Sequence, residues 1–465
     1  MVISRQSISF LSITALVMLL VGVVVARGQT RDESWKRCGE NDPDRAIEAC
    51  SALIESGQPS GHDLARAFYS RASAYARKGV DDRAIQDYAQ TLRLIPSFAN
   101  AFYGRGWAYA HEGDYDHAFQ DFDQALRLNP NLSDVLRERG IAYTHKNDYD
   151  LAIRDYDHAL RVNHGDAIAF YDRGAAYGHK RDYNHAIQDY DQALRLNPSF
   201  TEAFYGRGSA YAHKGDYDHA IQDFDQALRL NPSLVNAVYS RGVAYADKGD
   251  YDRAIADYDQ ALQLTPNDAD PFYRRGVAYK HKGDFDRAIR DFDQAIRLNP
   301  SLADAYITRG NAYDLKRDYD RAIQDFDQAL RLNPSSADAF YNRARVYEYK
   351  GDFDRAIPDY DQALRLKPSD ADAYYGRGFA YSHNRDYDRA IQDYDQALRI
   401  NPSYSAAFYN RSKAHAQRGD YLRAIADRGR FVWLNFGILG VTIRLCILTI
   451  AIALAFGFKR FRSNS

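Results

Sequence analysis

Histidine recurs at regular intervals in this chain. The first four residues of this row are His111, His145, His179 and His213, each 34 residues after the one before. His281 and His383 continue it later in the chain. Imidazole titrates near neutral pH and binds transition metals, so such a row could sense pH or hold a metal ion. Equivalent side chains on stacked helical layers lie about 10 Å apart, too far to share one ion. We expect no metal or other cofactor, and leave pH sensing and plain solvation of copied histidines as alternatives.

Arginine and aspartate follow the same 34-residue interval. We count positions 1 to 34 within repeats that begin at residues 65, 99, 133, 167, 201, 235, 269, 303, 337, 371 and 405. Position 7 is arginine and position 23 is aspartate in every repeat. The two positions are equally far from position 15, which is glycine in most repeats and predicts a turn.

Residues equally far from the turn of an antiparallel helical hairpin lie at the same height. The arginine stem can then cover apolar surface while its guanidinium reaches the carboxylate. We therefore expect structural ion pairs such as Arg105–Asp121 and Arg207–Asp223. The alternative is an arginine that stays solvated without a fixed partner. A more ordinary exposed pair is expected between Asp123 and Arg127, four residues apart on one helix.

Two of the three cysteines, Cys38 and Cys50, lie close together near the N-terminus. Neighbouring cysteines predict a disulfide in a chain that is exported, as the apolar N-terminus described below suggests for this one. A metal site is less favoured there because no histidine or second cysteine pair lies nearby.

The elements that must position these residues are pairs of helices. In the repeat that begins at residue 99, positions 4, 8 and 11 hold Phe102, Gly106 and Tyr109, which form one helical face. A second apolar face follows at positions 20, 24, 27 and 28, and the sequence EGD between them predicts a helix stop and a helix start. Small residues at positions 8 and 20 allow the two backbones to approach closely.

The pattern resembles the tetratricopeptide repeat, a helix–turn–helix of the same period, in its RG-x-A-Y variety from bacterial exported proteins. The resemblance covers residues 65–435 and implies an all-α fold. That fold is an α-solenoid, a right-handed superhelix of about eleven repeats with first helices lining a concave groove. Residues 29–64 are expected to form a partial repeat that caps the stack. Pro358 is expected to weaken or kink its helix, and Arg181, Arg317 and Arg385 to strain the turn at position 15.

Both ends of the chain are apolar. Residues 1–28 are typical of a signal peptide, or of an uncleaved signal anchor. Residues 436–458 predict a transmembrane helix, with an amphipathic helix on the membrane as the alternative, and 459–465 a basic cytoplasmic tail. Six of the 61 Lys and Arg lie in these apolar ends and none of the 63 Asp and Glu, so the region between is acidic. This balance argues against nucleic acid as a partner.

The resemblance places positions 5 and 13 in the groove. Position 5 is tyrosine in most repeats, at Tyr103, Tyr171, Tyr205, Tyr239, Tyr273, Tyr341 and Tyr375 among others. Tyrosine offers a broad ring and one polar tip, which suits a peptide, although these rings could instead pack as part of the scaffold. Position 13 carries the histidine row.

No nucleophile motif, phosphate loop or metal cluster interrupts the repeats, so we expect no enzyme and no small-molecule substrate. We expect a membrane-tethered scaffold that binds a protein or peptide of unknown identity in its groove. Its repeats are expected on the periplasmic side of a bacterial inner membrane. The alternative is a structural spacer or self-associating element of the envelope without a separate ligand.

Overall fold

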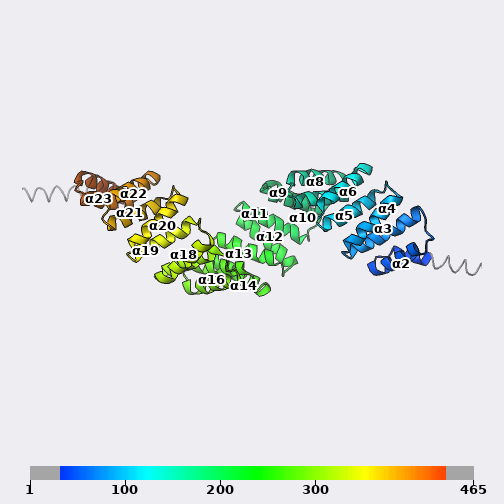
Figure 1. Ribbon diagram of the computed structural model, residues 1–465, viewed down its shortest axis with the longest axis horizontal. Helices are drawn as coiled ribbons and strands as arrows, with labels where there is room; N and C mark the ends of the chain where they lie inside the picture. Colours follow the sequence, from blue (N-terminus) through cyan, green and yellow to red (C-terminus); the bar gives the residue numbers. More distant parts are fainter. Residues whose placement is uncertain (1–31, 436–465) are drawn as a thin grey trace, which may run out of the picture. The chain divides into compact units, whose positions relative to one another are not determined.

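The computed structural model describes residues 32–435, and all regular structure in this range is helical (Figure 1). The chain divides into two compact units, which meet in sequence at Pro232 and Ser233 and are described separately. The signal sequence, transmembrane helix and basic tail expected at 1–28, 436–458 and 459–465 lie outside the described residues. Among the helices that are described, none is long and apolar enough to cross a membrane.

The described part of the first compact unit begins with a short helix over 32–38. The helices that follow are α2 (Pro43–Glu55), α3 (His62–Arg77), α4 (Asp81–Leu94), α5 (Ala99–His111), α6 (Tyr115–Leu128), α7 (Ser133–His145), α8 (Tyr149–Val162), α9 (Ala167–His179), α10 (Tyr183–Leu196), α11 (Thr201–His213) and α12 (Tyr217–Leu230). From α3 onward, the two helices of each repeat pack together as a hairpin, and each hairpin packs against the next within the unit.

The second compact unit repeats this arrangement, and its described part ends with a helix over 421–435. Its other helices are α13 (Val235–Asp247), α14 (Tyr251–Leu264), α15 (Ala269–His281), α16 (Phe285–Leu298), α17 (Ala303–Leu315), α18 (Tyr319–Leu332), α19 (Ala337–Tyr349), α20 (Phe353–Leu366), α21 (Ala371–His383), α22 (Tyr387–Ile400) and α23 (Ser405–Gln417). The described chain is therefore an all-α solenoid of consecutive helix pairs.

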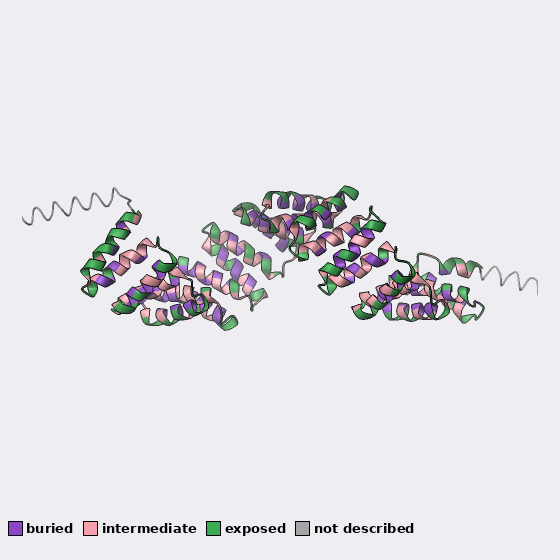
Figure 2. Cartoon of the chain, turned by 90° about the horizontal axis from the view of Figure 1, so that it is seen from above, coloured by how far each residue is buried: buried purple, intermediate pink, exposed green. Residues whose placement is uncertain are grey.

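Small residues set how closely the two helices of a hairpin approach. A Cβ atom added to Gly106 would lie 2.9 Å from the ring of Phe122, and one added to Gly208 equally close to Phe224. Ala118, at position 20, is fully buried. Figure 2 shows buried residues recurring along the helices, between intermediate and exposed ones. The core of most hairpins is thus an aromatic ring from the second helix that lies against a glycine backbone of the first.

The turn at position 15 adopts a left-handed backbone conformation. Glycine takes it at φ 84° in Gly113 and φ 78° in Gly215. Arg181, Arg317 and Arg385 take the same conformation at φ 60–63°, as the sequence led us to expect. A Cβ atom is crowded against the following carbonyl in this region, so these three turns carry backbone strain.

Pro358 does not interrupt its helix. α20 runs continuously from Phe353 to Leu366, the same 14 residues that the corresponding helices α18 and α22 span. The helix is therefore continuous through Pro358, and the expected weakening or kink stays a prediction. Aspartates at position 16 begin most second helices, where Asp114, for example, accepts a hydrogen bond from the backbone N–H of His117 at 3.2 Å.

Glycine in place of Arg181 should relieve the strain in its turn. We expect Arg181→Gly to raise the free energy of unfolding by about 1 kcal/mol, since the left-handed penalty of roughly 1–2 kcal/mol exceeds the extra chain entropy of glycine. Gly215→Ala is the matched control and should lower it, because the same φ is required there with free space around the Cβ. Urea unfolding checks both, and an Arg181→Gly variant less stable than the parent would contradict this account.

Candidate functional site

The arginines at position 7 bind the aspartates at position 23 of the same hairpin. Arg105 Nε and Nη2 each donate to one carboxylate oxygen of Asp121, both at 2.7 Å. Arg207 makes the same two-point contact to Asp223, at 2.8 and 2.6 Å. The aspartates are almost completely buried, and the arginine side chains about one-fifth exposed. The geometry is the one expected from the equal distances to the turn.

The third guanidinium nitrogen of most of these arginines reaches the preceding hairpin. Arg139 Nη1 donates to Asp123 of α6 at 2.6 Å, and Arg173 Nη1 to Asp157 of α8 at 2.5 Å. Contacts of the same kind join Arg207 to Asp191, Arg275 to Asp259, Arg309 to Asp293, Arg343 to Asp327, Arg377 to Asp361 and Arg411 to Asp395. Each of these arginines therefore joins two consecutive hairpins through two carboxylates.

The expected pair between Asp123 and Arg127 is wrong. Asp123 occupies position 25 and binds Arg139 of the next hairpin. The reason is geometric, because position 25 faces the first helix of the following hairpin, where a guanidinium is already held by Asp155.

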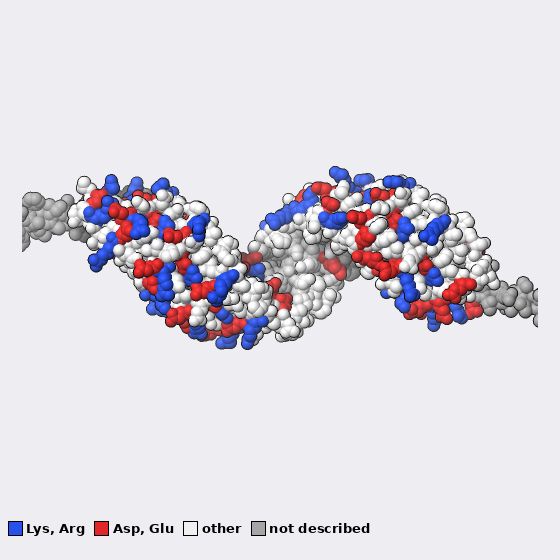
Figure 3. Space-filling view, in the orientation of Figure 1, with Lys and Arg blue, Asp and Glu red and all other residues white. Residues whose placement is uncertain are grey.

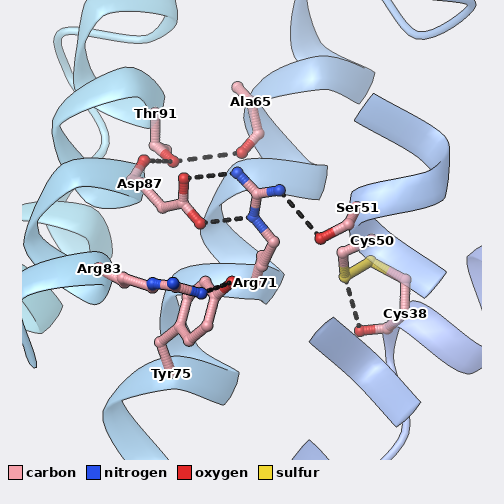
Figure 4. Close-up of polar contacts among 9 residues, drawn as sticks. All are labelled: Cys38, Cys50, Ser51, Ala65, Arg71, Tyr75, Arg83, Asp87 and Thr91. Atoms are coloured by element: carbon pink, nitrogen blue, oxygen red, sulfur yellow. Dashed lines mark hydrogen bonds and ion pairs between the residues drawn. A yellow bond between two sulfur atoms is a disulfide. The ribbon is translucent and has the colours of Figure 1, made fainter. Parts of the chain in front are cut away.

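At the N-terminal end, Arg71 makes the corresponding contacts with a different partner (Figure 4). It binds Asp87 of α4 at 2.6 and 2.8 Å, and its Nη1 donates to Ser51 of α2 at 3.0 Å. A disulfide between Cys38 and Cys50 joins α2 to the helix before it. The N-terminal end is thus held by the Arg71–Ser51 hydrogen bond and the disulfide. An ion pair of Lys78 with Asp44 and a hydrogen bond from Arg77 to the backbone carbonyl of Asn41 add to these contacts.

The pKa shifts of the two partners show why a buried arginine at position 7 needs the aspartate at position 23. The hydrogen bonds that Arg207 donates to Asp223 raise the pKa of the Arg207 guanidinium above its usual value. Burial has the opposite effect on the carboxyl group, and it raises the pKa of Asp223 although Arg207 opposes the change. The cost of removing charges from water therefore offsets much of the attraction between them.

A second contact between hairpins lies on the surface. Lys146 Nζ lies 3.0 Å from Asp116 of the preceding hairpin, and Arg418 Nε lies 3.1 Å from Asp388. Lysines at position 14 pair in the same way in several other repeats, and the two signs of charge are interspersed on the face shown in Figure 3. These exposed pairs contribute little each, but they fix which side chains of adjacent hairpins meet.

The tyrosines at position 5 are half-buried and pack within their own hairpins. Their ring centroids lie 5.7–6.5 Å from the aromatic ring at position 24, in Tyr103–Phe122, Tyr171–Tyr190, Tyr205–Phe224, Tyr239–Tyr258, Tyr273–Phe292, Tyr341–Tyr360 and Tyr375–Tyr394. Burial raises the pKa of the Tyr341 phenol to about 12. Each of these rings packs against its own hairpin on one side and is partly exposed on the other.

Some tyrosine hydroxyls also contact the next hairpin. Asn410 Nδ2 donates to the Tyr375 hydroxyl at 2.7 Å. Arg274 Nε lies 3.4 Å from the Tyr239 hydroxyl. In both cases the partner occupies position 6, where the residue type varies from one repeat to the next.

The histidines of position 13 are exposed and lie where two hairpins meet. His145, His179 and His213 stack on Tyr115, Tyr149 and Tyr183 of the preceding hairpins, with ring centroids 5.0–5.7 Å apart. His111 Nδ1 instead lies 2.6 Å from a carboxylate oxygen of Asp81. Across residues 32–435, histidine, cysteine and acidic side chains do not form any group of three or more suited to a metal ion.

Two neighbouring hollows share Trp107 on the first helices of the first compact unit. One is lined by Tyr69, Ser73, Ala76, Arg77, Tyr88, Asn100, Tyr103, Gly104 and Trp107. The other is lined by Trp107, Ala110, His111, Tyr115, Glu138, Ile141, Ala142 and His145. The described part of the groove here is therefore aromatic, with few charged groups.

A polar cluster, which the sequence did not single out, follows these hollows. Arg137 takes the place of tyrosine at position 5; it donates to Glu138 at 2.9 Å and lies 3.7 Å from Asp172. One guanidinium thus faces two largely buried carboxylates. Burial raises the pKa of Asp172 to about 7, and the nearby Arg137 only partly opposes this.

Comparisons with known proteins agree with this architecture. The family model described as "Tetratricopeptide repeat" matches residues 137–199, 171–235, 273–337, 341–405 and 380–428, more than half of the chain. A second model with the same description matches 99–132, and one described as "TPR repeat" matches 244–283. The chain belongs to the tetratricopeptide repeat family.

Three of the solved structures that are similar to parts of the chain are described here. MamA is 29% identical, with 36% of this chain and 96% of MamA covered and a TM-score of 0.34. YrrB, described as "a TPR protein with an unusual peptide-binding site", is 26% identical over 40% of this chain and 95% of its own, with a TM-score of 0.36. A repeat protein from Parabacteroides merdae is 23% identical over 54% and 96%, with a TM-score of 0.42. No curated protein matches the chain.

Truncation of one partner of a buried pair should cost more than removal of both. We expect Asp223→Ala to lower the free energy of unfolding by about 3–5 kcal/mol, because Arg207 loses the partner that satisfies two of its nitrogens. The Arg207→Leu/Asp223→Ala double variant should lose less. Asp191→Ala is the control and should cost about 1 kcal/mol or less, since Asp191 is partly solvated. Equal urea midpoints for the first two variants would rule out a structural pair.

Asp172 should make stability depend on pH. Its pKa in the fold is raised above the value of about 4 in an unfolded chain, so the folded state binds the proton more tightly. The free energy of unfolding should therefore fall as pH rises from about 4 to about 7. Asp172→Asn should make this profile flatter in urea titrations at several pH values. An unchanged slope would show that Asp172 ionises normally in the fold.

Proposed function

We propose that this chain is a non-enzymatic scaffold that binds an extended protein segment along the first helices of its hairpins. Tetratricopeptide repeat proteins are typically protein–protein interaction scaffolds rather than enzymes. The observation that carries the proposal is the pair of aromatic hollows that share Trp107. The half-buried Trp107 ring packs against the core and stacks on His111 at 5.2 Å between ring centroids, and it also lines both hollows. Large aromatic residues in open hollows are the usual sites of high contact energy in protein recognition.

We further propose that the scaffold is tethered to a bacterial inner membrane with its repeats on the periplasmic side. The apolar run at 436–458, followed by Lys459, Arg460 and Arg462, supports this orientation. The disulfide between Cys38 and Cys50 supports an oxidising compartment for the N-terminal end of the repeats.

A structural spacer remains the second candidate, and a specific observation favours it. The tyrosines and histidines assigned to the groove all pack against other parts of the scaffold, as Tyr205 does on Phe224 and His213 on Tyr183. In a spacer these contacts would be their whole role.

Selection of displayed peptides against the full chain separates the two candidates. A scaffold should enrich a common sequence, and Trp107→Ala should weaken its binding at least roughly tenfold, as expected for a central aromatic anchor. Tyr183→Ala is the matched control in the same compact unit, because Tyr183 stacks on His213 away from both hollows. It should change the dissociation constant little. If no sequence is enriched, or if both variants weaken binding equally, the groove proposal fails.

A further inference from the structure

The helix over 421–435, the second helix of the last hairpin, exposes a set of large apolar side chains. The exposed fractions are 66% for Tyr421, 84% for Leu422, 68% for Ile425 and 51% for Trp433. Ile425 and Trp433 follow Leu422 by three and eleven residues, close to one and three helical turns. The three side chains therefore project from the same side of the helix.

In the preceding hairpin the corresponding surface is charged and covered. Asp388 and Asp395 of α22 bind Arg418 and Arg411 of the hairpin that follows, at 3.1 and 2.5 Å. Ile391, between them, is buried in the core. These contacts fix the next layer of the stack.

One repeat later, the residues that make those contacts are replaced. Leu422 and Gly429 stand 34 residues after Asp388 and Asp395, and Ile425 stands 34 after Ile391. The two carboxylates that would bind another hairpin are gone, and the isoleucine is exposed. The end of a solenoid that faces water needs a polar outer surface, and this one is apolar. Something other than a further ion-paired hairpin is expected to cover it.

The arginines beside the apolar stripe, and the apolar sequence that follows the helix, indicate what covers this face. Arg423 and Arg430, both exposed, are seven residues apart and lie along one line beside the apolar stripe. An apolar stripe with a tryptophan, bordered by arginines, is the composition of a helix that lies in a lipid interface. The helix also leads directly into the apolar run at 436–458.

We propose that the Leu422–Ile425–Trp433 face rests on the surface of a phospholipid bilayer, with Arg423 and Arg430 near the headgroups. This inference rests on the proposed membrane tether. It adds that the last hairpin is held against the bilayer by its own side chains, so that the stack of hairpins begins at the lipid surface.

Tryptophan fluorescence can test this in the full chain. The protein contains only Trp35, Trp107 and Trp433, so Trp35→Phe/Trp107→Phe leaves Trp433 as the sole emitter. The chain is reconstituted in phosphatidylcholine–phosphatidylglycerol vesicles whose acyl chains carry bromine as a short-range quencher. Trp433 emission should fall roughly twofold relative to unbrominated vesicles, as for an interfacial residue. The matched control retains Trp107 in a Trp35→Phe/Trp433→Phe background and should not be quenched.

A variant of the face itself gives the second readout. Leu422→Asp restores the residue type of the inner hairpins, and together with Ile425→Gln it should abolish most of the quenching of Trp433. Vesicle flotation measures the tether independently. Protein that floats with the vesicles while Trp433 is not quenched overturns this inference and leaves the tether intact. Protein that does not float refutes both.

A second copy of the chain is the remaining alternative for the cover. In that case Trp433 would be shielded from acrylamide without quenching by bromine, and the shielding would fade on dilution. This result would overturn the inference in favour of an end-to-end dimer.

Discussion

A single 34-residue hairpin cannot bury its own apolar faces, and the way each hairpin is fixed to the next determines the rest of the structure. The arginine at position 7 holds neighbouring hairpins together. Its guanidinium makes a two-point contact with the buried aspartate of its own hairpin and a third contact with an aspartate of the hairpin before, as in Arg309 with Asp325 and Asp293. The planar group thereby sets both the internal and the external alignment of the helices.

We infer that the arginine adds specificity more than stability. Apolar stacking supplies the favourable free energy, through rings such as Phe224 against Gly208, but it is not directional. Charged contacts that must all be satisfied penalise a slipped pairing of hairpins, because a slip would leave buried carboxylates without a donor. The surface contacts of lysine with aspartate, and of histidine with tyrosine, repeat the same alignment at the outer edge of each layer.

Most of the fold could be predicted from the sequence because one period controls every position. The hairpins, the glycine against the aromatic ring, the strained turn at Arg181 and the pair Arg105–Asp121 all follow from local geometry. The contact between hairpins could also have been predicted from the sequence. Position 25 precedes the next position 7 by 16 residues, the spacing that also separates positions 7 and 23. Position 25 and the next position 7 are equally far from the loop between two hairpins, and this predicts the pair Asp123–Arg139 rather than Asp123–Arg127.

The surface of the groove could not be predicted in this way. Whether a hollow exists around Trp107 depends on how side chains from three helices fill the space between layers, and periodicity carries no information about that. The same holds for Arg137, whose neighbours Glu138 and Asp172 come from two different hairpins. Function is therefore less predictable here than fold, because recognition depends on the positions that depart from the repeat.

The central claim is that the arginine couples neighbouring hairpins, and a double-mutant cycle measures that coupling directly. Arg309→Met, Asp293→Asn and the double variant would be compared by urea unfolding, with Arg309 on α17 and Asp293 on α16. The account predicts a coupling free energy of about 0.5–1 kcal/mol, since Asp293 is partly exposed. Strictly additive effects of the two substitutions would contradict it.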